Sequence, residues 1–210
     1  MSVRLKTARL FALTAVFLTC VGATFSPARQ SLVNDAIRLQ DSVLTNEAFS
    51  SILRELARRD GIKWPETIAD CASANANGFP DKISWLLARF ERDRGYAVSS
   101  VRAWRKFNPF SSTTAATTPC VLTTKLNLWR LKRSPASVAG TLVHERTHSF
   151  GIVHAYGQRP APNICDAAYV SGTTAEALLE PSLVQAESIC PALCTILVER
   201  RIVATCNRQR

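Results

Sequence analysis

The sequence has only three histidines, one methionine and, after residue 23, no apolar run long enough to cross a bilayer, which takes about 20 residues. It also lacks internal repeats, paired C-x-x-C motifs and any nucleic-acid-binding motif. These absences argue against a repeat architecture, a cysteine-ligated metal and specific recognition of nucleic acid. With 210 residues and an apolar share of 47%, the chain is long and apolar enough to bury one core.

Residues 1–23 have the composition of a secretory signal peptide. Three basic residues come first, an apolar run follows from residue 10, and Val21-Gly22-Ala23 offers small residues before a cleavage site. The run is too short to span a bilayer comfortably. We therefore predict a signal peptide at 1–23 and an exported domain at 24–210, secreted or periplasmic, with an uncleaved N-terminal membrane anchor as the alternative.

The cysteines that remain after residue 23 are even in number. They are Cys71, Cys120, Cys165, Cys190, Cys194 and Cys206. An even set in an exported chain favours disulfides, here up to three, and the sequence does not choose among the 15 pairings that six cysteines allow. The Cys190–Cys194 spacing does not fit a thioredoxin-type redox pair, so we interpret these two cysteines as structural.

The chain is strongly basic, with a formal charge of +10 and twenty arginines against six lysines. Removal of residues 1–23, which carry three cations and no acid, would leave +7. This balance favours anionic partners such as envelope polymers or membrane headgroups. The cationic clusters are spread along the chain and are interrupted by acids, so we interpret most of them as solvated faces.

Hydrophobic spacing and capping residues predict a helix-rich α+β single domain. Predicted helices cover 31–60, divided at Thr45-Asn46, then 81–95, 98–107, 135–150, 166–179 and 183–198. One strand is predicted at 121–131, with loops at 62–80, 111–119 and 157–163.

All three histidines of the chain fall within residues 144–154. His144 and His148 are four residues apart on a predicted helix, so both imidazoles lie on one face and can share one zinc ion. Glu145 points about 100° around the helix, where it can act as a general base on water without binding the metal. Gly151 ends the helix, which allows His154 to approach as a third ligand.

This run fits H-E-x-x-H-x-x-G-x-x-H and resembles the metzincin signature of the zincin metallopeptidases. The resemblance covers residues 144–154. It implies a zincin-like domain with a small sheet beside the active-site helix and a substrate extended along an edge strand, for which 121–131 is the candidate. One feature departs from the family: metzincins carry a methionine turn beneath the metal, and the only methionine here is Met1.

A second, shorter run, Asp166-Ala167-Ala168-Tyr169, is similar to the D-x-x-Y element of the aspzincins. That resemblance implies Asp166 as the third zinc ligand and Tyr169 as the group that stabilises the oxyanion. We prefer His154 as the third ligand, and Asp166 could instead orient a ligand histidine. Tyr156 is a rival to Tyr169 as the phenol.

Together these patterns predict an exported zinc metalloendopeptidase that hydrolyses a peptide or protein substrate, with Glu145 activating a water molecule. An amidase acting on cell-wall peptides would use the same metal chemistry. A different class of function stays open as the alternative, namely an exported basic binding or structural protein of the cell envelope, with structural zinc or none.

Overall fold

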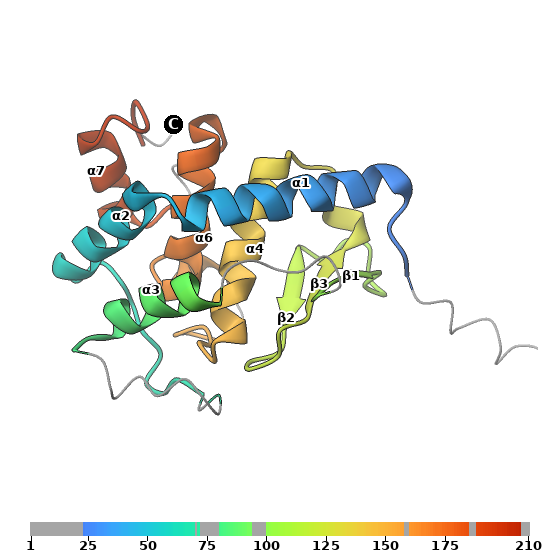
Figure 1. Cartoon of the computed structure of the whole chain (residues 1–210), viewed down its shortest axis with the longest axis horizontal. Helices are drawn as coiled ribbons and strands as arrows, with labels where there is room; N and C mark the ends of the chain where they lie inside the picture. Colours follow the sequence, from blue (N-terminus) through green and yellow to red (C-terminus); the bar gives the residue numbers. More distant parts are fainter. Residues whose placement is uncertain are drawn as a thin grey trace, which may run out of the picture.

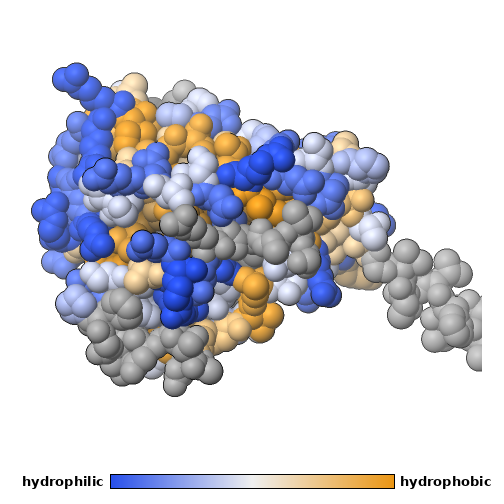
Figure 2. Space-filling view, viewed as in Figure 1, coloured by the Kyte–Doolittle hydropathy of each residue, from blue (hydrophilic) through white to orange (hydrophobic). Residues whose placement is uncertain are grey.

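The computed structural model describes residues 23–69, 71, 80–93, 100–157, 160–184 and 188–206. The predicted signal peptide lies outside these ranges apart from Ala23. No helix in these ranges is long and apolar enough to cross a membrane. On the face drawn in Figure 2, hydrophilic residues cover much of the surface and hydrophobic residues show between them in separate patches.

Helices make up most of the fold. They are α1 (Pro27–Leu44), α2 (Glu47–Arg58), α3 (Lys82–Arg92), α4 (Pro135–Ser149), α5 (Pro160–Asn163), α6 (Ala167–Leu179) and α7 (Pro191–Glu199). Four of them begin at a side chain that accepts a hydrogen bond from the first turn, as capping residues do. These caps are Asn46, Asp81, Ser134 and Asp166.

Three short strands form one mixed sheet. The strands are β1 (Val101–Trp104), β2 (Ala115–Thr117) and β3 (Thr124–Asn127), in the order β1-β3-β2. The β1–β3 pair is parallel, with Val101 opposite Thr124, and the β2–β3 pair is antiparallel, with Ala115 opposite Leu126. The helix-rich α+β prediction is therefore confirmed.

Several predicted elements in the middle of the chain were wrong. The helix expected at 98–107 is replaced over residues 101–104 by β1, and the loop expected at 111–119 contains β2. Both strands are too short to have a clear pattern of their own, and pairing with β3 overrides local propensity. The strand expected at 121–131 is reduced to residues 124–127, followed by a 3-10 turn (Leu128–Arg130).

The role predicted for that strand was also wrong, because β3 is the central strand of the sheet. A central strand has both of its edges occupied, so it cannot pair with a substrate. The edge strand on the side of α4 is β2.

Two predictions near the C-terminus need correction. The helix expected at 183–198 starts only at Pro191, after a 3-10 turn at Pro181–Leu183, and the loop expected at 157–163 contains α5. Proline favours the first position of a helix, which explains the start of α7. The expected stop of the third helix at Gly95 lies outside the described residues.

Helix α4 lies at the centre of the molecule, between the sheet on one side and α6 on the other (Figure 1). Val143 and Phe150 pack into a core shared with α2, α3, α6 and α7. Val138 and Leu142 pack into a second core between α1 and the sheet. Because both faces of α4 are packed, its polar side chains have little freedom to move.

Helices α4 and α6 cross where two glycines meet. A Cβ on Gly172 would lie 2.8 Å from the carbonyl oxygen of Gly140, and one on Gly140 would lie 2.9 Å from that of Gly172. Neither position has room for a side chain, so this pair allows the two backbones to approach closely. The close crossing brings the start of α6 beside the histidines of α4.

Three disulfides join the cysteines that follow residue 23. The pairs are Cys71–Cys120, Cys165–Cys190 and Cys194–Cys206. Cys190 and Cys194 belong to different bridges, which agrees with a structural role for both. Disulfides persist in oxidising compartments, so this set indicates an extracellular or periplasmic location.

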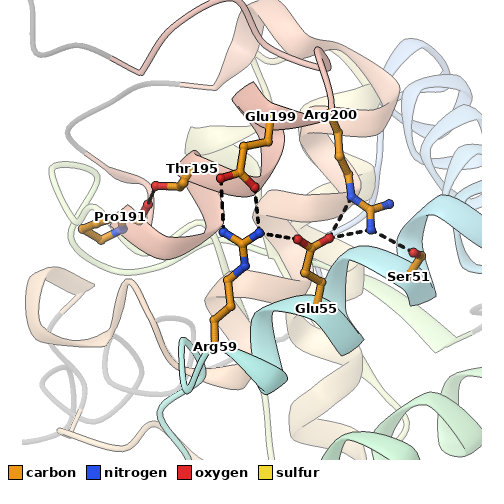
Figure 3. Close-up of polar contacts among 7 residues, drawn as sticks. All are labelled: Ser51, Glu55, Arg59, Pro191, Thr195, Glu199 and Arg200. Atoms are coloured by element: carbon orange, nitrogen blue, oxygen red, sulfur yellow. Dashed lines mark hydrogen bonds and ion pairs between the residues drawn. The ribbon is translucent and has the colours of Figure 1, made fainter.

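Helix α7 is also attached to α2 by an ion-pair network on the surface (Figure 3). Arg59 contacts Glu199 at 2.7 Å and Glu55 at 2.5 Å, and Arg200 contacts Glu55 at 2.6 Å. Arg200 also donates to the hydroxyl of Ser51 at 3.0 Å. The network therefore joins the end of α2 to the end of α7.

Candidate metal centre

His144 and His148 lie one turn apart on α4, which begins as its sequence predicts. Ser134 accepts a hydrogen bond from the backbone N–H of Ser137, and Pro135 occupies the first helical position. The two imidazole rings have their centroids 5.1 Å apart. The predicted placement of both histidines on one helix face is confirmed.

A glycine turn ends α4 and redirects the chain. The N–H of Ile152 donates to the carbonyl of Thr147 at 3.2 Å, and the N–H of Gly151 donates to the carbonyl of His148 at 2.9 Å. This pair of bonds is the Schellman arrangement, and Gly151 has the left-handed φ of 98° that it requires. A Cβ on Gly151 would also lie 2.4 Å from the carbonyl oxygen of Ala69.

The turn brings His154 back to the helix. One nitrogen from each of His144, His148 and His154 can be chosen so that all three lie within 4.8 Å of one another, a group that could hold a metal ion. The ring of His154 is centred 4.7 Å from that of His148 and 5.3 Å from that of His144. The three histidines of the sequence therefore form one cluster.

Two of the three rings are oriented by acceptors on their Nδ1 atoms. The Nδ1 of His148 lies 2.7 Å from the carbonyl oxygen of Ile152, which can only accept, so this Nδ1 carries the proton. The Nδ1 of His154 lies 2.7 Å from the Oδ2 of Asp166. Both contacts leave Nε2 as the metal-binding atom, which is the arrangement that metal-ligating histidines usually have.

Asp166 is fully buried, and both of its carboxylate oxygens are engaged. Its Oδ2 contacts His154, while its Oδ1 accepts from the backbone N–H of Tyr169 at 2.9 Å and so caps α6. The structure groups His154 with the other two imidazoles and places Asp166 behind His154. Of the two roles considered for Asp166, the contacts favour the orientation of a histidine.

Burial keeps the imidazoles of His144 and His148 in the neutral form that binds metals. Desolvation lowers the pKa of His144 well below its usual value, and the neighbouring His148 and His154 lower it further. Burial also lowers the pKa of His148. A metal ligand must be a neutral imidazole, so these shifts favour metal binding near neutral pH.

Glu145 is 5% exposed, and its Oε2 has no hydrogen-bond partner in the described part of the chain. Burial raises its pKa to about 7, against the lowering effects of a hydrogen bond with Thr117 and of the nearby His154. An orphaned carboxylate oxygen is costly in a protein interior unless another group satisfies it. The missing partner of this oxygen therefore favours a polar ligand at the site.

Glu145 faces a cavity of about 650 Å³. His144, His154 and Tyr169 line the same cavity, together with residues of β2 and of the loop before it. Imidazoles, a buried carboxylate and a phenol therefore line one cavity, whose volume is typical of sites that bind small ligands.

Tyr169 lies beside the histidines. Its ring centroid is 4.6 Å from that of His144 and 5.3 Å from that of His154. Burial raises its pKa to about 12, with the charges of Asp166 and Glu145 adding to the effect, so the phenol keeps its proton. Tyr156 is 55% exposed and is not among the residues that line this cavity, so Tyr169 is the phenol that meets the cluster.

Several site residues could not be predicted from local sequence. Thr117 of β2 hydrogen-bonds Glu145, and the backbone N–H of Cys120 donates to the carbonyl of His148 at 3.2 Å. Asn163 holds the loop after His154, because its amide bonds the backbone of Tyr156 and Gly157. The contacts of Thr117 and Cys120 come from segments distant in the sequence, whereas Asn163 lies six and seven residues from its partners, and no local pattern signals any of them.

The fold and the cluster define a disulfide-bonded α+β protein with a three-histidine group that could hold a metal. Comparisons with protein-family models, curated proteins and solved structures give no match for the chain. Its function is therefore argued from the geometry of this site.

Proposed function

We propose that this protein is an exported zinc metalloendopeptidase of the zincin kind. The observation that carries the proposal is the grouping of His144, His148 and His154 beside a cavity. His144 and His154 line this cavity together with Glu145, whose buried Oε2 has no hydrogen-bond partner in the described part of the chain. Three protein ligands and a neighbouring carboxylate are typical of catalytic zinc sites, whereas structural sites are closed by four protein ligands.

The donor set supports zinc. Three neutral imidazoles suit zinc better than the oxygen-preferring cations magnesium and calcium. The Nε2 atoms left free on His148 and His154, together with a nitrogen of His144, would hold the ion. When bound, zinc supplies Lewis acidity, which makes water more acidic and a carbonyl more electrophilic.

Glu145 is proposed as the group that moves the proton. With a pKa of about 7, its carboxylate can take a proton from water and release it again at neutral pH. The water oxygen forms a bond to the carbonyl carbon, the carbon–nitrogen bond breaks, and the proton passes through Glu145 to the leaving amine. Thr117 fixes the carboxylate by a hydrogen bond from β2.

Tyr169 is proposed to stabilise the carbonyl oxygen as it becomes negative. Its phenol remains protonated below its pKa of about 12 and lines the same cavity, so it can donate a hydrogen bond there. Asp166 positions the site from behind, because it holds the ring of His154 and caps the helix that carries Tyr169.

The edge strand β2 is proposed to bind the substrate in an extended conformation. Ala115 and Ala116 line the cavity, and among the described residues β2 pairs with one strand, β3. An extended peptide can add to such an edge through backbone hydrogen bonds. This role replaces the one expected for residues 121–131.

The direct test is a Glu145→Gln variant that still binds zinc. Purified protein is incubated with a peptide library, and new termini are identified by mass spectrometry. We expect zinc-dependent cleavage by the unchanged chain and a loss of about 100-fold or more in the variant. Glu66→Gln, at an exposed position, is the matched control. Full activity in the Glu145→Gln variant would remove the proposed mechanism.

A basic envelope-binding protein with structural zinc or none is the second candidate. It is favoured by the charge of the described segment 100–144, which carries seven cations and no acid. Metal analysis separates the two candidates, because the enzyme should carry about one zinc per chain and lose activity with a chelator. Tight binding to envelope material without any chelator-sensitive activity would favour the second.

A further inference from the structure

The loop that follows β1 presents two phenylalanines to solvent. We call residues 105–113 the aromatic loop. Phe107 is 103% exposed and Phe110 is 88% exposed, the two highest values among the exposed large hydrophobic residues of the described chain. Soluble proteins rarely leave such large apolar side chains entirely unpacked at neighbouring positions, so this exposure calls for an occupant.

The exposure does not come from a lack of local structure. The side-chain oxygen of Asn108 accepts from the N–H of Phe110 at 2.9 Å, and the backbone carbonyl of Asn108 accepts from the N–H of Ser111 at 3.2 Å. Arg130 donates to the carbonyls of Ser111 and Phe110 at 2.9 and 3.3 Å. The backbone of the loop is therefore held in a defined turn, from which the two rings project.

Two cations of the loop, Arg105 and Lys106, lie over tryptophan rings and have no acidic partner in the described part of the chain. Arg105 lies over the ring of Trp129, with 5.5 Å to the centroid, and Lys106 lies over the ring of Trp104 and donates to Thr113 at 2.8 Å. Neither cation pairs with a carboxylate in the described part of the chain. The sequence contains no Asp or Glu from residue 94 to residue 144.

We propose that the aromatic loop docks this protein on the surface of an anionic lipid bilayer. Phe107 and Phe110 would enter the boundary between headgroups and acyl chains, while Arg105 and Lys106 meet lipid phosphates. Trp129, which is 47% exposed and donates from its indole to the carbonyl of Lys106 at 3.2 Å, has the amphipathic ring that favours the interface. Both phenylalanine side chains are almost entirely exposed, which suits insertion into a fluid surface.

Docking in this way would bring the cavity to the membrane. Lys106, Ser112 and Thr113 belong both to the aromatic loop and to the lining of the cavity that contains His144 and His154. The loop is therefore part of the cavity wall, and a bound bilayer would lie beside it. This inference does not depend on the proposed hydrolysis, because it rests on the loop alone.

The test is a vesicle-binding measurement on exported protein whose N-terminus has been read by mass spectrometry. Vesicles of phosphatidylcholine with about one third phosphatidylglycerol are compared with pure phosphatidylcholine vesicles by flotation. We expect salt-sensitive binding to the anionic vesicles. Phe107→Ser/Phe110→Ser should weaken it about 100-fold, roughly tenfold for each ring. Arg105→Ser/Lys106→Ser should weaken it about 20-fold, on anionic vesicles only.

The chain offers a matched control at the other end of the sheet. Val121 and Leu122 are 44% and 48% exposed and lie in the loop that precedes β3, whereas the aromatic loop follows β1, which runs parallel to β3. Val121→Ser/Leu122→Ser should leave vesicle binding within about twofold of the unchanged chain. Brominated lipids should quench tryptophan fluorescence, and Trp129→Phe should remove most of that quenching.

Three results would overturn the proposal. The first is an unchanged chain that does not bind the anionic vesicles, or a Phe107→Ser/Phe110→Ser variant that binds them as tightly as the unchanged chain, with the fold verified by thermal unfolding. The second is a dimer in light scattering that this variant dissociates, without vesicle binding, since a second copy would then cover the rings. The third is binding to a single-stranded oligonucleotide that depends on the two rings while vesicles are ignored.

Discussion

At the scale of residues, two of the candidate ligand histidines are oriented by hydrogen-bond acceptors on their Nδ1 atoms. His148 is held by the carbonyl of Ile152 and His154 by the carboxylate of Asp166, each at 2.7 Å. These contacts select the tautomer and fix the ring plane, so the metal-binding nitrogens are arranged before any ion arrives. The chain therefore stabilises the site through residues that do not touch the metal.

Asp166→Asn tests this arrangement. If the single amide oxygen caps α6, the NH2 group faces the Nδ1 of His154 and cannot accept its proton. We expect zinc affinity to fall about 10- to 100-fold, measured by competition with a chromophoric chelator. Asp35→Asn, on the surface of α1, should leave the affinity unchanged. Equal affinity in both variants would show that Asp166 only caps the helix.

The buried carboxylate of Glu145 predicts a pH dependence for the metal-free protein. Its pKa is about 7 in the fold and 4.5 in the unfolded chain, so between these values the unfolded state ionises first. Stability should therefore fall as pH rises from about 4.5 to 7 and then level off. The size of the fall is about 3–4 kcal/mol, since the two pKa values differ by about 2.5 units and each unit corresponds to ~1.4 kcal/mol.

Chemical denaturation of the metal-free chain at pH 5 and at pH 8 measures this effect. Glu145→Gln should be more stable than the unchanged chain at pH 8 and about as stable at pH 5. If the difference in stability between Glu145→Gln and the unchanged chain were the same at pH 5 and at pH 8, Glu145 would already be ionised in the folded protein at pH 5.

At the scale of elements, the turn at Gly151 decides where His154 goes. Gly151 combines a φ of 98° with a position where a Cβ would lie 2.4 Å from a backbone oxygen. Gly157 has a φ of 76° and no atom within 4 Å of such a Cβ. A comparison of alanine substitutions at the two glycines therefore distinguishes the cost of the left-handed backbone, which both share, from the cost of the close contact at Gly151.

Gly151→Ala should destabilise the protein by about 3 kcal/mol or more, whereas Gly157→Ala should cost only ~1 kcal/mol. Urea denaturation gives the free energies of unfolding, and zinc titration should show weaker binding for the first variant alone. Similar small losses in both variants would contradict the close approach of residue 69 to the turn.

The elements that sequence predicted well are those with local signals. Asn46, Asp81 and Ser134 begin helices by capping, and the spacing of His144 and His148 depends only on the period of one helix. Strands β1 and β2 were missed because four- and three-residue strands are defined by their partner, not by their own pattern. Thr117 was missed for the same reason, since its contact with Glu145 exists only once β2 packs on α4.

At the scale of the whole molecule, the Cys71–Cys120 disulfide connects two distant segments at the end of α4. Its bridge closes a separation of 49 residues. Cys120 donates its N–H to the carbonyl of His148, and the sulfur of Cys71 lies beside Gly151. This bridge therefore supports the turn that carries the chain toward His154.

Cys71→Ser/Cys120→Ser should lower the free energy of unfolding by about 2–5 kcal/mol and also weaken zinc binding. Cys194→Ser/Cys206→Ser removes the bridge between α7 and residue 206, with a separation of 12, and should lower stability without a change in zinc affinity. Thermal unfolding and chelator competition on both variants make the comparison. If zinc affinity fell in both double variants in proportion to their loss of stability, the Cys71–Cys120 bridge would have no local role at the site.

The most direct measurement is X-ray absorption at the zinc edge on protein loaded with one equivalent of zinc. The account predicts three imidazole nitrogens at about 2.0–2.1 Å and an oxygen in the remaining position, with one imidazole lost in His154→Ala. A spectrum with fewer than three imidazoles, or a protein that binds no zinc, would contradict the proposal that these three histidines form one metal site.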